Sequence, residues 1–269
     1  MTILVKGQAA PDVAATAAAQ SARDALGVFG EALIGVWAIH LSPERLPGVA
    51  AVGDAIGRID AMAARRDTFG RAPAADGRGA PLAIKDGALA ADCTTVPLWT
   101  DARPVDRTSF GLGMLYNFTP AALASTSYHM GNDDSNGGSV PATLRRSVGG
   151  SVDQLVTWKG ITSAWLRDTA SASAQADARI EETGWRTIAV DEHGGNSAMA
   201  IDRRDPVIAP TDGQVPTLNS VRFGGSSDAN PGKGAVAAFM VCDGPLVQDA
   251  ARRAAWQDFC AALLRDLMQ

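Results

Sequence analysis

The 269 residues of this chain are enough for one large domain with a full hydrophobic core, or for two small domains. Hydrophobic residues make up 46% of the chain and charged residues 20%, which is a globular composition and excludes a disordered one. The net charge of -5 argues against nucleic acid and anionic membrane as partners, because both attract basic surfaces. The sequence contains no apolar run long enough to cross a membrane as a helix.

Residues 1–28 are predicted to form a helical segment for attachment or oligomerisation. From Asp12 to Leu26 the sequence is rich in alanine and lacks glycine and proline, and Gly27 is expected to end the helix. Small residues allow close helix–helix approach, so we expect a homo-oligomer or docking on other subunits; a surface helix or flexible tail is the alternative. The first residues lack a signal-peptide pattern, so we expect synthesis in the cytoplasm.

Residues 29–269 are predicted to form one β-sandwich domain. The run ALIGVWAIHL is predicted as a strand, and residues 43–80, rich in Pro, Gly, Arg and Asp, are predicted as a long connection. Asp86-Gly87 then joins two short strands, since this dipeptide is a strong hairpin signal. The 28 glycines and 14 prolines add many turns, and the sequence lacks an alternating strand–helix rhythm. These features favour a mostly β fold.

The second half of the chain continues this pattern. Residues 109–118 carry apolar side chains at alternate positions, which is typical of a strand with one face on a core. Residues 186–202 are predicted as a hairpin with the turn DEHGGN, and AVAAFMVCDGPL as a strand buried on both faces. After Leu246, apolar residues recur at spacings of three and four, which predicts a C-terminal helix.

Several of these segments resemble laminin-G-like domains of the concanavalin A-like superfamily, as found in phage and prophage proteins. The similar segments are GRGAPLAIKDGALAADCTTVPLW, SFGLGMLYNF, GWRTIAVDEHGGNSAMAIDRRDPV and VRFGGSSDANPGKGAVAAFMVCDGPL, and together they cover residues 30–269. The resemblance implies a two-layer jelly-roll sandwich of a lectin-like kind that binds carbohydrate. With the added N-terminal helix, it implies attachment to a phage spike, a tail fibre or the head of a gene transfer agent.

Catalytic patterns are weak in this sequence. Glycoside hydrolysis needs two carboxylates across one cleft, but Glu181 and Glu182 are adjacent, and Asp191 and Glu192 fall in a predicted turn. The chain lacks a G-x-S-x-G elbow, and GGSSDANPGKG lacks the phosphate-loop pattern. Three histidines are isolated in the sequence: His40, His129 and His193. We therefore predict that the protein is not an enzyme.

A group of oxygen-bearing side chains is the candidate ligand site. Asn132, Asp133 and Asp134 could hold a calcium ion, which prefers such ligands, although tight turns use the same residues. No other cofactor is expected. The three cysteines have no metal-site or disulfide-framework spacing, so we expect buried thiols, with one bridge and one free thiol as the alternative. They are Cys93, Cys242 and Cys260.

Tryptophan is the second type of candidate binding residue, because its ring can stack on the C–H face of a sugar. Core packing is the alternative for each of five tryptophans, which are Trp37, Trp99, Trp158, Trp165 and Trp185. Trp158 and Trp165 are the better candidates for stacking, because they flank a segment with few aliphatic residues. The predicted ligand-binding residues are Asp133, Asp134, Asn136, Trp158, Trp165, Asp228 and Asn230.

The combined hypothesis is an accessory protein at the surface of a virion or phage-like particle, present there after assembly and lysis. Its sandwich would bind host-surface polysaccharide, and its N-terminal helix would join other virion subunits. One alternative is a purely structural docking module of a capsid or fibre. The other is a polysaccharide-degrading enzyme.

Overall fold

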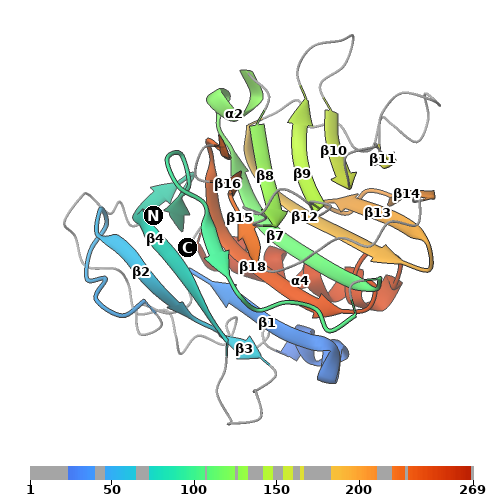
Figure 1. Cartoon of the computed structure of the whole chain (residues 1–269). Coiled ribbons are helices and arrows are strands. Elements are labelled where there is room, and N and C mark those ends of the chain that lie inside the picture. Colours follow the sequence, from blue (N-terminus) through green and yellow to red (C-terminus); the bar gives the residue numbers. More distant parts are fainter. Residues whose placement is uncertain are drawn as a thin grey trace.

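The computed structural model describes residues 24–39, 46–64, 73–106, 108–124, 127–132, 142–147, 154–159, 164–166, 183–210, 220–227 and 230–267. Within these ranges the protein is mostly β, with a curled antiparallel sheet and few helices (Figure 1). This confirms the predicted fold class at that level. The helix expected between residues 12 and 26 lies almost entirely outside the described residues.

The described elements follow one another in chain order. The helices are η1 (Leu26–Ala32), α2 (Pro120–Ala124) and α4 (Ala250–Leu267). The strands of the first half of the chain are β1 (Leu33–Ala38), β2 (Ala55–Asp60), β3 (Ala63–Ala64), β4 (Ala74–Lys85), β5 (Ala88–Asp92), β6 (Leu98–Thr100), β7 (Phe110–Phe118) and β8 (Ser127–Asn132). The remaining strands are β9 (Ala142–Ser147), β10 (Gln154–Lys159), β11 (Ala164–Leu166), β12 (Gly184–His193), β13 (Asn196–Ile201), β14 (Val207–Pro210), β15 (Val221–Phe223), β16 (Gly225–Ser227), β17 (Asn230–Pro231) and β18 (Ala235–Asp243).

The long strand β4 divides the sheet into two halves. The main strand order is β11-β10-β9-β8-β15-β6-β4-β5-β18-β7-β12-β13-β14, with β2 beside β4 and β1 beside β18. The first residues of β4 pair with β2 and β6, and its last residues pair with β5. Between these two parts, Arg78 and Gly79 have positive φ angles of 52° and 80°. We call the strands from β11 to β6, with β2 and the start of β4, the β8 half, and the remainder the β7 half.

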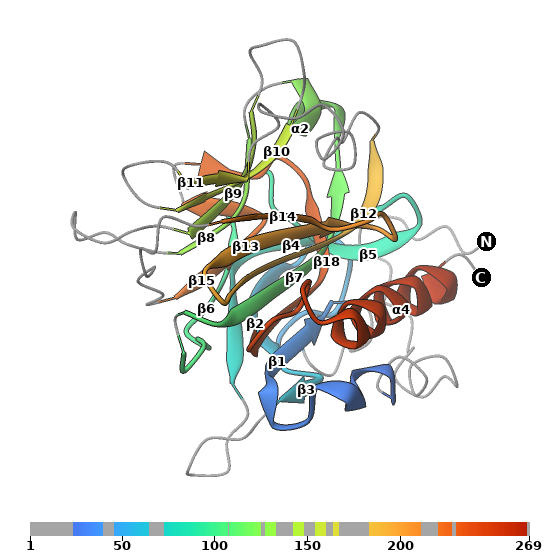
Figure 2. The same ribbon diagram turned by 90° about the vertical axis from the view of Figure 1, so that its right-hand side faces the viewer.

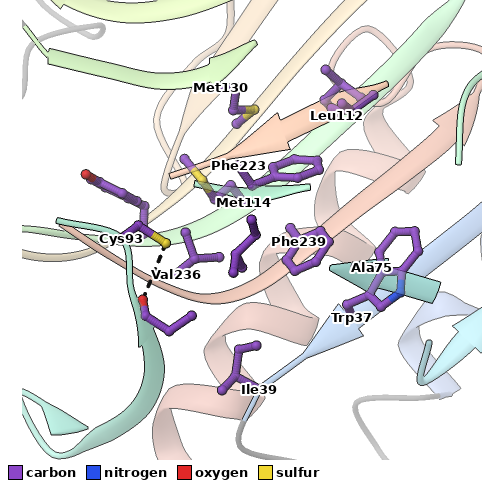
Figure 3. Close-up of a cluster of buried hydrophobic side chains, with 14 of the residues drawn as sticks. Trp37, Ile39, Ala75, Cys93, Leu112, Met114, Met130, Phe223, Val236 and Phe239 are labelled. Atoms are coloured by element: carbon purple, nitrogen blue, oxygen red, sulfur yellow. Dashed lines mark hydrogen bonds between the residues drawn. The ribbon is translucent and has the colours of Figure 1, made fainter. Parts of the chain in front are cut away.

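The two halves face each other across the main hydrophobic core. Phe223 of β15 packs on Phe239 of β18 with 4.6 Å between ring centroids, and Phe239 stacks on Trp37 of β1 at 5.0 Å. Figure 3 shows these rings together with Met114 of β7. Because β15 and β18 belong to different halves, the contact closes the curled sheet into a two-layered arrangement.

Helix α4 covers the other face of the β7 half (Figure 2). Trp256 of α4 is fully buried, and its Nε1 donates a hydrogen bond to the carbonyl of Ile188 at 3.1 Å. Successive side chains of β7 point alternately into the two cores: Met114 belongs to the main core and Leu115 to the core beneath α4. All nine residues of β7 are therefore buried. The predicted C-terminal helix and the predicted alternation in residues 109–118 are confirmed. The expectation that only one face of this strand meets a core is wrong, because α4 covers the other face.

Local predictions had mixed outcomes. The hairpin at Asp86-Gly87 is confirmed, with both residues at positive φ, 47° and 82°, as a two-residue primed turn requires. The prediction of a turn over the whole of DEHGGN is wrong, because the pairing of β12 with β13 extends to His193 and leaves a turn of only Gly194 and Gly195. The predicted connection over residues 43–80 is also wrong in part, since it contains β2 and β3.

The three cysteines are free and buried, as predicted: Cys93, Cys242 and Cys260. Burial raises the pKa of the Cys93 thiol to about 12 and that of the Cys242 thiol to about 12. The thiols therefore act as small core residues.

Candidate functional site

The predicted site residues fall into three groups. Asp133, Asp134, Asn136 and Asp228 lie outside the described residues. Asn132 ends β8 and Asn230 begins β17, on strands that are not paired with each other. Trp158 and Trp165, in contrast, are direct register partners across β10 and β11. Among the described candidates, the tryptophan pair is thus the one that the sheet brings together.

The register extends this pair into a longer row across the β8 half. Trp158 is opposite Thr143, Thr143 is opposite Gly131, and Gly131 is opposite Arg222. Arg222 is in turn opposite Trp99, which is opposite Asp76 of β4. We call this set the Trp row; it consists of Asp76, Trp99, Arg222, Gly131, Thr143, Trp158 and Trp165.

The part of the Trp row from Asp76 to Gly131 lies on the face of the β8 half that is turned away from the main core. Val221 and Phe223 belong to the main core, so Arg222 between them belongs to the opposite face. The same alternation places Trp99, which follows the core residue Leu98, on that outer face. The register pairs that define the row cross seven strands, and directly opposed residues share a face of the sheet. With about 4.8 Å between neighbouring strands, the row is about 29 Å long.

The described part of the row combines an acid, an aromatic ring and a cation. Asp76 accepts a hydrogen bond from the Arg78 backbone N–H at 2.7 Å. Trp99 is partly exposed, whereas Arg222 is 5% exposed. Ser220, two positions before Arg222, is 4% exposed. Within the described part of the chain, the Trp99 Nε1 and the Ser220 Oγ are buried and lack a hydrogen-bond partner.

The sequence alone did not single out Trp99, Arg222 or Asp76 as site residues. Trp99 ranked behind Trp158 and Trp165, because no sequence feature beside it argued against core packing, the commoner role of a single tryptophan. Strands β6 and β15 have three residues each, which is too short to show a period-2 pattern. The signal in the sequence that pointed toward this surface was the presence of several tryptophans, three of which lie in the β8 half of the structure.

A second polar group lies where β7 begins and β12 ends. The Ser109 Oγ is 2.7 Å from the His193 Nδ1, so His193 has a hydrogen-bond partner despite its isolation in the sequence. Asp106 accepts hydrogen bonds from the hydroxyl and the backbone N–H of Thr108, and these bonds lower the pKa of its carboxyl group. These side chains are at the surface or only partly buried.

Asp191 and Glu192 are strand residues with separate structural contacts. Asp191 accepts hydrogen bonds from the backbone N–H groups of Val247 and Gln248 at 2.6 and 2.8 Å, which fixes the loop before α4. Burial raises the pKa of this carboxyl group, and these bonds oppose the increase. Glu192 accepts a hydrogen bond from the hydroxyl of Ser197. Neighbouring residues in a strand point to opposite faces, so the two carboxylates do not share a site.

The described residues contain no group of three or more His, Cys, Asp or Glu side chains arranged to hold a metal ion. No helix in the same ranges is long and apolar enough to cross a membrane.

Comparison with known proteins identifies related folds. No family model and no curated protein sequence matches the chain. The structure is similar to that of an arabinofuranosidase complexed with arabinofuranosyl-α-1,2-xylobiose, with a TM-score of 0.52 and 11% identity over 77% of this chain and 51% of that one. It is also similar to a mutant GH54 α-L-arabinofuranosidase, with a TM-score of 0.54 and 10% identity over 90% of this chain and 65% of that one. The chain thus spans less than two thirds of either enzyme.

At these identities the similarity concerns the fold. It is consistent with a curled β-sandwich, but shows neither the laminin-G nor the phage relationship that the sequence resemblance implied. The prediction that the protein is not an enzyme is contradicted, because both of these similar structures are arabinofuranosidases. The fold therefore belongs among those that carbohydrate-active proteins use.

Proposed function

We propose that this protein binds polysaccharide along the Trp row of the β8 half. The observation that carries the proposal is the register that aligns Trp99, Trp158 and Trp165 on one face of the sheet. Tryptophan offers an apolar surface to sugar rings, while Asp76 and Arg222 offer an acceptor and donors for polar groups. The similarity to two arabinofuranosidases supports carbohydrate as the ligand class.

The test is a binding measurement with a panel of polysaccharides, by affinity electrophoresis and titration calorimetry. Trp158→Ala and Trp165→Ala should each weaken binding by about tenfold or more, since stacked aromatic contacts of about 1.4 kcal/mol correspond to that factor. Trp185→Phe is the matched control, because Trp185 lies in the β7 half and donates its Nε1 hydrogen bond to the Lys85 carbonyl. Equal binding by all three variants, or no binding to any polysaccharide, would refute the proposal.

A second candidate function is glycoside hydrolysis, which two carboxylates near Trp99 favour. Asp76 is directly opposite Trp99, and Asp101 lies two positions beyond Trp99 along the chain. Diagonal neighbours of this kind are about 7–8 Å apart, within the separation of about 6.5–9.5 Å used by inverting glycosidases. One carboxyl group would protonate the leaving glycosidic oxygen, and the other would remove a proton from the attacking water.

Release of reducing ends from arabinan and arabinoxylan tests this second function. Asp76→Asn and Asp101→Asn should each abolish the activity, and Asp101→Asn should leave binding to the same polymers intact. Activity that survives both substitutions would place the chemistry elsewhere. Binding without any release would leave the protein as a carbohydrate-binding module.

The finer points of the sequence-based hypothesis remain proposals. They are a concanavalin A-like jelly-roll with a helix at each end, a domain boundary at residue 28, a homo-oligomer and virion subunits joined through residues 1–28, host attachment at a particle surface, and calcium at Asn132, Asp133 and Asp134. Light scattering with and without residues 1–28 tests the oligomer. Calorimetric titration with calcium, with and without chelator, tests the metal site.

A further inference from the structure

The Trp row continues beyond Asp76 to one more strand. Arg58 of β2 is directly opposite Asp76, which is directly opposite Trp99. In the described part of the chain, β2 pairs with β4 alone and lies at the border of the sheet (Figure 1). Each of the three residues has a chain neighbour in the main core, so their side chains share the outer face. These neighbours are Ile59, Ala75 and Leu98. We call Arg58, Asp76 and Trp99 the row end.

The row end is accessible from the solvent. Exposure rises along the row, from Arg222, which is 5% exposed, to Trp99 and Asp76, which are partly exposed. It is highest at β2, where the side chain of Arg58 is 62% exposed. A polymer lying on the outer face can therefore reach the row end without entering a cavity.

Local hydrogen bonds hold the two charged groups of the row end and leave part of each group without a partner. The Arg58 Nε donates to the Asp60 Oδ1 at 2.7 Å, and the Asp76 Oδ1 accepts from the Arg78 backbone N–H at 2.7 Å. Among the described residues, the terminal nitrogens of Arg58 and the second oxygen of Asp76 make no hydrogen bond. Opposed residues are about 5 Å apart, so a charged donor and a charged acceptor lie side by side.

Two neighbouring hydroxyl groups of a sugar fit this pair. A hydroxyl group both donates and accepts, so one can accept from the Arg58 guanidinium while its neighbour donates to the Asp76 carboxylate. The charge on each protein group strengthens the bond that it makes. Trp99 is one strand away from Asp76, about 4.8 Å, where its ring can pack on the C–H face of a sugar. A sugar carboxylate, in contrast, would meet the two acids Asp60 and Asp76 beside one arginine.

We infer that the row end selects uncharged polysaccharides whose sugar units keep two neighbouring free hydroxyl groups. The inference rests on the proposed polysaccharide function and names its ligand class. Arg58 donates to one hydroxyl group, Asp76 accepts from the neighbouring one, and Trp99 packs against the sugar ring. Because local bonds already hold both charged groups, little side-chain freedom is lost when the sugar binds.

The experiment measures calorimetric binding of linear hexasaccharides of 1,4-linked xylose, 1,5-linked arabinose and 1,4-linked glucose, whose inner units all keep two neighbouring hydroxyl groups. The tightest binder is compared with its derivative that carries one O-acetyl group on each unit, which removes one hydroxyl group of each pair. The acetylated form should bind about tenfold more weakly. Arg58→Gln and Asp76→Asn should each weaken binding of the free form several-fold and reduce the difference between the two forms to less than about twofold.

Arg203→Gln is the matched control. Arg203 is 66% exposed at its side chain and forms an ion pair with Asp258 of α4, in the β7 half, so this variant should bind as the wild type does. Arg58 is equally superficial, and Asp76→Asn keeps an oxygen for the Arg78 N–H, so the urea midpoints of both test variants should stay close to that of the wild type. If Asp76→Asn does not fold, Arg58→Gln alone decides the test.

The outcomes separate this inference from the proposed function. If acetylation leaves binding unchanged, or if both variants discriminate as the wild type does, the inference is wrong and the polysaccharide proposal stands. The same holds if none of the three hexasaccharides binds while another polysaccharide does. Hexagalacturonate should bind more weakly than the uncharged ligands, because Asp60 and Asp76 repel its carboxylates, and tighter binding would overturn the inference. If no polysaccharide binds, the proposed function itself fails.

Discussion

The ring of Phe223 lies 4.6 Å from the ring of Phe239, although the two residues belong to opposite halves of the curled sheet. Their neighbours along each strand turn the other way: Arg222 faces outward from the β8 half, and Met240 packs in the core beneath α4. The aromatic contact therefore lies between two outer surfaces of different composition. The outer surface of the β8 half carries Arg222 and Trp99, and the outer surface of the β7 half is covered by a helix.

Phe239→Ala should strongly destabilise the protein. The side chain is fully buried and contacts both Trp37 and Phe223, so its removal leaves a cavity between the two halves. The expected loss in the free energy of unfolding is about 3–5 kcal/mol, measured by urea denaturation. Phe239→Leu should cost clearly less, and Val105→Ala, at a residue 78% exposed, should cost almost nothing. A similar midpoint for wild type and Phe239→Ala would contradict the two-layered core.

Asp191 should make the stability depend on pH in an unusual direction. Burial raises its folded-state pKa above the ordinary value of 3.8, so the folded protein binds this proton more tightly than the unfolded chain. The stabilising contribution is complete below pH 3.8 and is lost as the pH rises through the raised pKa. Thermal unfolding of wild type and Asp191→Asn across this range should show wild type losing stability relative to the variant as the pH increases.

Asp191→Ala provides the complementary test. This variant removes the acceptor for the backbone N–H groups of Val247 and Gln248 at every pH. The expected cost is about 1–3 kcal/mol, because buried donors are left unpaired. Asp191→Asn keeps an oxygen for these bonds and should be much milder. Equal effects of the two variants would show that the loop before α4 does not depend on this acceptor.

The three cysteines should be unreactive in the folded protein. All are buried, and the pKa of about 12 for Cys93 and for Cys242 leaves almost no thiolate at neutral pH. A colorimetric thiol reagent should therefore detect essentially none in native buffer and all three in concentrated urea. Rapid reaction of one thiol without denaturant would reveal local opening of the strand or helix that carries it.

Gly113→Ala should displace α4. A Cβ at this position would lie 2.6 Å from the Cε2 of Trp256 and 2.8 Å from the Cγ of Met240, so the helix has to shift. Overpacking of this kind typically costs about 1–3 kcal/mol. Trp256→Phe removes the obstructing atoms, and the double variant should be less destabilised than the sum of the two single variants. Strict additivity in chemical denaturation would argue against this contact.

Local patterns in the sequence were sufficient for parts of the fold. The alternation in Phe110, Leu112 and Met114 identified β7 as a strand facing a core, and Asp86-Gly87 identified the hairpin between β4 and β5. The assignment of Asp191 and Glu192 to a turn failed, because pairing with β7 and β13 extends β12 against the local preference of acidic and glycine residues for turns.

The Trp row shows what local patterns cannot reveal. Trp99 and Arg222 are 123 positions apart in the chain, and each lies in a strand of three residues. Their neighbourhood depends on how distant strands pair, which no short window of sequence contains. Sequence reasoning proposed Trp158 and Trp165 as binding residues, but not the residues that continue their row.

Strand β4 is shared by both layers, and this has a consequence for how the protein unfolds. Asp76, near the start of β4, belongs to the Trp row, and the last residues of β4 pair with β5. There Lys85 of β4 forms a 2.9 Å ion pair with Asp92 of β5. Detaching the layer that contains the Trp row would therefore pull apart the pairing on which the opposite layer depends. We expect the layers to melt together in one cooperative transition, so that a bound glycan on one side protects amide hydrogens from exchange on the other.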